Sequence, residues 1–301
     1  MTIPVQLAAE VAEALRLGRP VVALETTLVA HGFTDGQGLE VAIAAEDRVR
    51  SAGAVPATVG ILDGAVRAGL GRAELERFAE AGASARKAGA RDLAVCVAQH
   101  ALGATTVGGT LAVCRRLGIC FMGTGGIGGV HRGFAQSLDI SGDLAQIART
   151  QAVVVASGAK SILDVGATAE LLETLGVPVL GWRTATLPLF YSAGGGPAVS
   201  ATVSTSAEAA TVAALHWQFN PSCGVLLAQP PAHGLDIEPL IAEAVERVRR
   251  QGVSGQSVTP AVLALVHELS GGRSVAVNRQ LIADNAALAA EVAVAYAGRQ
   301  E

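Results

Sequence analysis

Short apolar runs alternate with longer alanine-rich segments along most of the chain. The segments 38–53, 104–118, 141–150, 161–176 and 208–219 carry apolar positions at helical spacing, whereas residues 20–27, 57–62, 118–123, 152–157, 178–182 and 223–229 form short apolar runs. Runs that are apolar on both sides predict strands buried on both faces, and the intervening helices serve as crossovers. The pattern therefore predicts a layered α/β/α sandwich.

The two ends of the chain fit the same picture. Residues 1–20 form an amphipathic helical pattern with internal glutamates, which argues against a signal peptide. From Asp236 onward the pattern predicts three helices and no strand, and the Gly- and Ser-rich stretch 191–206 predicts a flexible surface loop or irregular hairpin. With no fixed-period repeat and no sharp linker, we expect residues 1–301 to form a single domain.

Composition excludes several classes of protein. Half of the residues are apolar and 16% are charged, which excludes a disordered chain. The formal charge is -4 and only 3% of residues are aromatic, so a nucleic-acid binder is not expected. No apolar run reaches the ~20 residues of a membrane span. The four cysteines lack CxxC spacing and lie among apolar residues, which predicts buried reduced thiols and a cytoplasmic protein.

Lysine is the rarest charged residue. The chain has only Lys87 and Lys160 against 20 arginines, so a lysine persists where arginine cannot substitute. Arginine is always protonated, whereas a desolvated lysine can lose its proton and attack a carbonyl carbon. Lys160 follows an apolar strand pattern at 152–157, and ligands gather at the carboxyl ends of such strands. A role in Schiff-base chemistry is therefore favoured over a solvated surface position.

Three further stretches carry candidate chemistry. Glu25 ends an apolar strand pattern, where desolvation would raise its pKa for acid–base work, although an exposed strand-end glutamate is the alternative. The glycine-dense segment 123–133 matches G-x-G-x-x-G but lacks the following helix and the later acidic residue of a dinucleotide site, so an anion- or sugar-binding loop or a structural turn is favoured. In 138–144, Asp139 and Asp143 flank a Ser-Gly step, which indicates either a helix start or a site for a hard cation.

Ten blocks of the chain, in order, resemble the pseudouridine-5′-phosphate glycosidase family. The most specific are "GTGGIGGVHRG" at 123–133 and "GAKSILD" at 158–164; others include "ALETT" at 23–27, "DISGDL" at 139–144 and "SVTPAVLALVHELSGG" at 257–272. The resemblance implies a single α/β/α domain that assembles as a homotrimer. It also implies cleavage of pseudouridine 5′-phosphate to uracil and ribose 5-phosphate.

The resemblance assigns roles residue by residue. Glu25 matches the proton donor, Lys160 the covalent nucleophile and Asp139 the Mn²⁺ ligand. The implied substrate-binding positions are Lys87, Val107, Thr124, His131, Ser141, Gly142, Asp143 and Asn278. The chemistry is coherent, because a C–C glycosidic bond offers no leaving group to ordinary ring protonation, and an imine with ring-opened ribose supplies an electron sink.

The chain departs from the family beside the site. After His31 it reads "HGFTDGQG", without the two prolines and the asparagine usual there, and the segments near 203 and 229 also differ. Removing prolines and adding glycines predicts a more mobile loop that offers an aromatic face, so uracil is expected to be a poor aglycone. An alternative is therefore a C-glycosynthase that attaches ribose 5-phosphate to an aromatic polyketide in antibiotic biosynthesis. A non-catalytic sugar-phosphate-binding protein is disfavoured, since it would need neither Glu25 nor Lys160.

Overall fold

The protein is built on a large mixed sheet. The computed structural model describes residues 3–33, 36–253 and 258–299. Nine strands follow one another across the sheet in the order β1 (Val5–Leu7), β4 (Ala65–Ala68), β3 (Val55–Leu62), β2 (Val21–Glu25), β7 (Phe121–Gly123), β9 (Val153–Ala156), β13 (Val225–Ala228), β11 (Val179–Trp182) and β12 (Ala201–Val203). β6 (Gly103–Thr105) pairs with β3 and with β5 (Arg86–Ala88), while β8 (Val130–His131) and β10 (Leu163–Asp164) form a separate pair.

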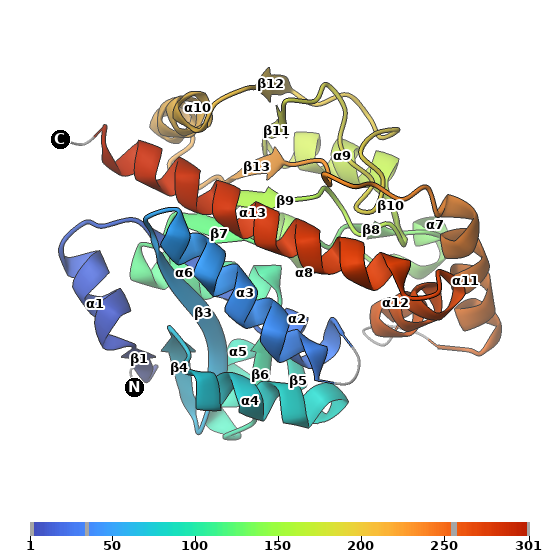
Figure 1. The fold of residues 1–301 in the computed structure, drawn as a ribbon, viewed down its shortest axis with the longest axis horizontal. Helices are drawn as coiled ribbons and strands as arrows, with labels where there is room; N and C mark the ends of the chain where they lie inside the picture. The colour runs from blue at the N-terminus through green and yellow to red at the C-terminus, as the bar shows by residue number, and fades with distance from the viewer. Residues whose placement is uncertain (1–2, 34–35, 254–257, 300–301) are drawn as a thin grey trace.

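Helices cover both faces of this sheet. The elements are α1 (Ala9–Arg16), α2 (Thr27–His31), α3 (Gln37–Ser51), α4 (Arg72–Ala81), the 3₁₀ turn η1 (Gly82–Ser84), α5 (Leu93–Ala98), α6 (Val107–Leu117), α7 (Phe134–Ser137), α8 (Gly142–Ile147), α9 (Val165–Thr174), α10 (Ser206–Phe219), α11 (Glu238–Arg250), α12 (Val258–Leu269) and α13 (Arg273–Ala297). The long α13 and α3 cross in front of the sheet and α6 lies behind it (Figure 1). α13 packs on β2, β7 and β9. The predicted α/β/α layering is confirmed.

The buried strands are those that the apolar runs predict. β2, β7, β9 and β13 are buried at every position, because helices cover them on both sides. The expected helices are also present, as are three helices after Asp236. The short strands β5, β6, β8 and β10 are not predicted, since runs of two or three residues carry no readable period.

The segment 191–206 matches its prediction only in part, because residues 192–200 form an irregular loop whereas the two ends of the segment do not. Tyr191 is buried, with 1% of its surface exposed, and residues 201–203 form the edge strand β12, which pairs parallel to β11. Two of its three residues are exposed, so its sequence lacks the apolar signature of a central strand. The N-terminal segment likewise contains the strand β1 before α1.

Parallel register brings three chain segments to one edge of the sheet. Ala23 of β2 pairs with Met122 of β7, which pairs with Val154 of β9. The residues that follow these positions therefore leave the sheet at the same level. Glu25 ends β2, Thr124 follows β7, and the segment after β9 leads to Lys160.

Two further expectations can be compared with the structure. All four cysteines are free, and the predicted burial is confirmed for three of them, whereas Cys120 is half-buried. Among the helices that the structure describes, none combines the length and apolarity that crossing a membrane requires.

Candidate active site

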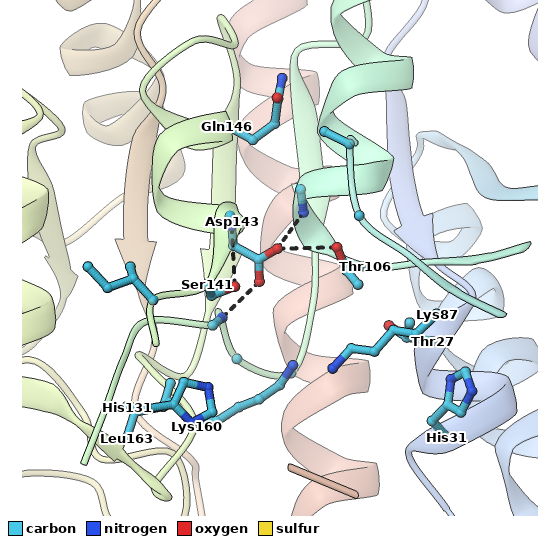
Figure 2. Close-up of a pocket in the computed structure, with 18 of the residues that line it drawn as sticks. Thr27, His31, Lys87, Thr106, His131, Ser141, Asp143, Gln146, Lys160 and Leu163 are labelled. Atoms are coloured by element: carbon cyan, nitrogen blue, oxygen red, sulfur yellow. Dashed lines mark hydrogen bonds between the residues drawn. The ribbon is translucent and has the colours of Figure 1, made fainter. Parts of the chain in front are cut away.

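A cavity of about 730 Å³ opens at the carboxyl ends of the central strands. Lys87 and Lys160 line it from opposite sides, and their amines point toward one another across it (Figure 2). The rest of the wall includes residues of α2, the segment 89–92, the start of α6, the loop after β7, the segment 139–149 and α13. The two lysines singled out by their rarity therefore share one site, although 73 residues of sequence separate them.

Glu25 lies beneath the floor of this cavity. Only 2% of its surface is exposed, and its two carboxylate oxygens accept hydrogen bonds from the hydroxyls of Thr27 and Thr124. Burial raises its pKa, while the positive charge of Lys160 and the two threonine bonds oppose that shift. Thr27 lines the cavity directly above it. The expected desolvated carboxyl at the end of β2 is thus confirmed as a feature of the fold.

Thr27 and His31 reach the cavity because they lie one helical turn apart on α2. His31 contacts the Ala85 carbonyl oxygen through Nε2, at 3.0 Å; because a carbonyl only accepts, Nε2 carries the proton. Burial lowers the pKa of His31, which favours the neutral ring. Neither residue is singled out by the sequence, since only the short helix after β2 places them on this wall.

The two lysines come from different elements, and the charge of Lys160 affects the pKa of Lys87. Burial lowers the pKa of the Lys87 amine, and the positive charge of Lys160 lowers it further, while Asp143 and Glu25 act in the opposite direction. Lys87 comes from the short strand β5. Lys160 follows β9, where its backbone N–H donates to the Ile127 carbonyl at 3.1 Å.

Asp143 organises the loops around the site. Its carboxylate accepts hydrogen bonds from the backbone N–H groups of Gly108 and Gly128, at 2.7 and 2.9 Å, and from the Thr106 hydroxyl at 3.2 Å. Its own N–H donates to the Ser141 hydroxyl, which caps α8. The helix start predicted in segment 138–144 is confirmed, and the segment also lines the cavity, while the cation site stays a prediction.

The glycine-dense loop after β7 is built for close contacts. A side chain at Gly128 would meet the Ser141 hydroxyl at 2.3 Å, so glycine is needed where the loop crosses α8. The loop runs on into β8 instead of opening a helix, and the dinucleotide fingerprint is not formed.

Asp139 stands at the edge of the cavity and is 39% exposed in its side chain. His131 Nδ1 lies 3.8 Å from Asp139 Oδ2, and burial lowers the pKa of His131 while Asp139 opposes that shift. Within the described ranges no three His, Cys, Asp or Glu side chains gather as a metal-binding group. A single accessible carboxylate fits a hard cation that keeps water or substrate oxygens as its other ligands, and it does not fit zinc.

Of the other substrate-binding positions that the family resemblance implies, some line the cavity and some do not. Ser141, Gly142 and Asn278 line the cavity with the residues above. Val107 does not, because its side chain is fully buried in the core, although its neighbours Thr106 and Gly108 line the wall. Thr124 lies below the floor beside Glu25 and contacts no open space through its side chain. The cavity also includes Gln146 and Arg149 of the α8 region, which the sequence reasoning missed.

The loop after His31 is only partly described, because residues 34–35 lie outside the described ranges. Phe33 packs against the main hydrophobic core and is not among the residues that line the cavity. Gly36 adopts φ 73°, and a Cβ at Gly38 would meet the Val29 carbonyl oxygen at 2.2 Å. Gly36 and Gly38 therefore serve the junction of α2 and α3, and among the described loop residues Phe33 presents no aromatic face to the cavity.

Comparisons with known proteins identify the family of this chain. A pseudouridine-5′-phosphate glycosidase of Salinispora tropica is 48% identical over 97% of this chain and 91% of its own, and that of Escherichia coli K12 is 42% identical over 97% and 95%. The crystal structure of the prealnumycin C-glycosynthase AlnA in complex with ribulose 5-phosphate matches with a TM-score of 0.90 and 40% identity, over 100% of this chain and 99% of its own. The family model described as "Indigoidine synthase A like protein" matches residues 10–295. The chain belongs to this family, together with the pseudouridine-5′-phosphate glycosidases that its sequence resembles.

Proposed function

We propose that this protein makes and breaks the C–C glycosidic bond between C1 of ribose 5-phosphate and a planar aglycone, with pseudouridine 5′-phosphate as the substrate and Lys160 as the nucleophile. One observation carries the proposal: Lys160 lines the cavity, and the buried Glu25 carboxyl lies just outside it, bonded to the cavity residue Thr27 and close enough to feel the charge of Lys160, with its pKa raised by burial. The relatives named for this reaction support it.

The residues account for each proton and electron pair. Lys160 Nζ, as the neutral amine, bonds to C1 while the ring C1–O bond breaks, and the departing oxygen takes the proton that Nζ loses. Glu25 then gives its proton to the aglycone carbon, the C–C bond breaks, and the lysine nitrogen lone pair forms the imine at C1. Water hydrolyses this imine to ribose 5-phosphate and free Lys160, and the reverse sequence builds the bond.

Lys87 is the candidate for the phosphate. Arg91 and Arg149 also line the cavity, but the Lys87 amine faces that of Lys160 across it, and an ammonium serves well as a point charge for a phosphoryl group. The hydroxyl of Ser141, the backbone at Gly142, the His131 ring and the Asn278 amide supply the remaining substrate contacts that the family resemblance implies, while Val107 lies behind the wall between the cavity residues Thr106 and Gly108. Asp143 holds the backbone of Gly108 in place, and Thr124 donates a hydrogen bond to the Glu25 carboxyl.

Asp139 is proposed to hold Mn²⁺ or Mg²⁺. When bound, such an ion would supply a positive charge near the phosphate or sugar oxygens. The accessible carboxylate supports this assignment, and the nearby His131 can hold Asp139 in place. We further propose that the protein acts as a homotrimer in the cytoplasm, which size-exclusion chromatography with light scattering would test.

A second candidate is C-glycosynthesis on an aromatic polyketide in antibiotic biosynthesis. The match to the prealnumycin C-glycosynthase and the absence of both family prolines after His31 favour it. Incubation with pseudouridine 5′-phosphate, followed by quantification of uracil and ribose 5-phosphate, tests the main proposal. Lys160→Arg serves as the matched control, because it keeps the charge and removes the nucleophile.

A further inference from the structure

Asn285 of α13 contacts both catalytic segments from the core. It is fully buried, and its amide nitrogen Nδ2 donates to the Thr124 carbonyl at 2.7 Å and to the Ser157 hydroxyl at 3.1 Å. A carbonyl oxygen only accepts, so the amide nitrogen must face Thr124. One side chain therefore ties the loop after β7 to the loop after β9.

Close packing of α13 makes this contact possible. A Cβ at Gly123 would lie 2.8 Å from the Ala286 Cα, so the end of β7 approaches the helix backbone as only glycine allows. This approach brings the short amide of Asn285 within reach of the chain beyond the strand. Gly123, which ends β7, is therefore needed for Asn285 of α13 to reach the loop after the strand.

Each of the two loops carries part of the proposed chemistry. The residue whose carbonyl accepts the Asn285 bond, Thr124, donates its hydroxyl to Glu25. Ser157 begins the segment that leads to Lys160. The loops are also joined to each other, since Ser157 N–H donates to the Gly125 carbonyl at 2.9 Å and Lys160 N–H to that of Ile127 at 3.1 Å.

The two acceptors that face Asn285 require an amide N–H donor at this position. Within the described residues, Asn285 Oδ1 has no hydrogen-bond partner, and burying an unpaired acceptor is costly. The residue is therefore used for its two N–H groups. An aspartate of the same shape would set a carboxylate oxygen against the Thr124 carbonyl and would destroy the contact.

We propose that Asn285 is a positioning residue that fixes Glu25, through Thr124, relative to Lys160. The proposal rests on the proposed function above. It goes beyond the residues that touch substrate, because Asn285 is not among the residues lining the cavity.

The test compares Asn285→Ala and the milder Asn285→Ser with Ser274→Ala. Ser274 is an equally buried polar residue of α13, and its hydroxyl contacts Ser270, His267 and the Tyr191 hydroxyl, none of which lines the cavity. Each variant is assayed for kcat, KM, thermal unfolding and the pH profile of kcat. Asn285→Ser guards against loss of folding in the alanine variant.

The proposal expects a kcat lowered by about tenfold or more with KM little changed, the pattern of an interaction needed in the transition state. Because the Thr124 bond lowers the pKa of Glu25, loosening it raises that pKa and moves the alkaline limb of the profile to higher pH. Ser274→Ala should reduce only the unfolding temperature. Adding Asn285→Ala to Thr124→Val should change kcat no further, since the same path is already broken.

Three results would overturn the assignment. One is an unchanged pH profile with activity losses that match those of Ser274→Ala, and another is full additivity with Thr124→Val. The third is a wild-type protein that neither turns over pseudouridine 5′-phosphate nor forms a borohydride-reducible adduct, which removes the proposed function as well. A wild-type protein that does both while the first or second result holds rejects the role of Asn285 alone.

Discussion

Lys87 and Lys160, the only lysines of the chain, point their amines at one another across a single cavity. Two cations of this kind repel each other unless an anion lies between them or one loses its proton. A ribose 5-phosphate that bonds to one lysine through C1 and offers its phosphate to the other would satisfy both. Lys87 lies on β5 and Lys160 follows β9, so the fold brings together two lysines that are far apart in the sequence.

Replacing Lys87 should weaken substrate binding more than it slows chemistry. Lys87→Ala is expected to raise KM by about tenfold to a hundredfold with a smaller loss in kcat, because a uniform binding contact has been removed. Lys87→Arg, which keeps a positive charge, serves as the control. An unchanged KM for the phosphorylated substrate in Lys87→Ala would exclude Lys87 from phosphate binding.

The Lys87 amine also gives KM a pH dependence. Burial and the charge of Lys160 lower its pKa, so it becomes neutral at a lower pH than an ordinary lysine. The protonated form binds the phosphate, and KM should therefore rise as the pH climbs through this lowered pKa. Lys87→Arg should lose the dependence, since arginine stays charged; persistence of the same rise in that variant would assign it to another group.

Glu25 should set the alkaline limit of bond cleavage. Burial raises its pKa, so the carboxyl keeps its proton to a higher pH than an exposed glutamate. Cleavage needs that proton, and kcat is expected to fall as the pH rises through the raised pKa. Glu25→Gln, which cannot donate the proton as an acid, should lower kcat by about a hundredfold or more and abolish this limb. The measurement is kcat between pH 5 and 10 for both proteins. A Glu25→Gln variant that retains the wild-type pH profile would contradict the assignment.

Metal dependence is predicted at Asp139. Exhaustive chelation should remove activity, and Mn²⁺ or Mg²⁺ should restore it, because a lone carboxylate suits hard cations. Asp139→Asn should raise the metal concentration needed for half-maximal activity and leave the fold intact, as its side chain is partly exposed. Full activity of the chelated wild-type protein would remove the metal from the reaction.

Uracil should be a good aglycone. The sequence alone predicts poor use of uracil, on the basis of an aromatic and loosened loop after His31, but Phe33 packs against the core and Gly38 is required by its contact with Val29. We therefore expect kcat/KM for uracil release within about tenfold of the Escherichia coli relative, or roughly 1.4 kcal/mol in transition-state binding. A much lower value, with ribose 5-phosphate still bound, would favour the C-glycosynthase candidate.

Some of the site could be read from the sequence because residue type alone limits the options. The rarity of lysine singles out Lys160, and the apolar run before Glu25 predicts the burial that the structure shows. The buried parallel strands can also be predicted, because strands that helices cover on both faces have uniformly apolar sequences. These features depend on local composition, so one sequence is enough to find them.

Other parts of the site depend on tertiary contacts that no local pattern records. His31 reaches the cavity because α2 makes a single turn after β2, and Asn285 reaches Thr124 only because Gly123 lets α13 approach. The bonds of Asp143 to Gly108 and Gly128 join segments that are 35 and 15 residues away. Spacing along the chain gives no signal for such contacts.

The imine on Lys160 is tested most directly by borohydride reduction in the presence of ribose 5-phosphate, followed by intact-mass and peptide mass spectrometry. The wild-type protein should gain the mass of one reduced ribose 5-phosphate adduct, mapped to Lys160, and Lys160→Arg should gain none and lose turnover. An adduct on Lys87, an adduct that persists in Lys160→Arg, or a Lys160→Arg variant that keeps a tenth of the wild-type rate would contradict the nucleophile assignment.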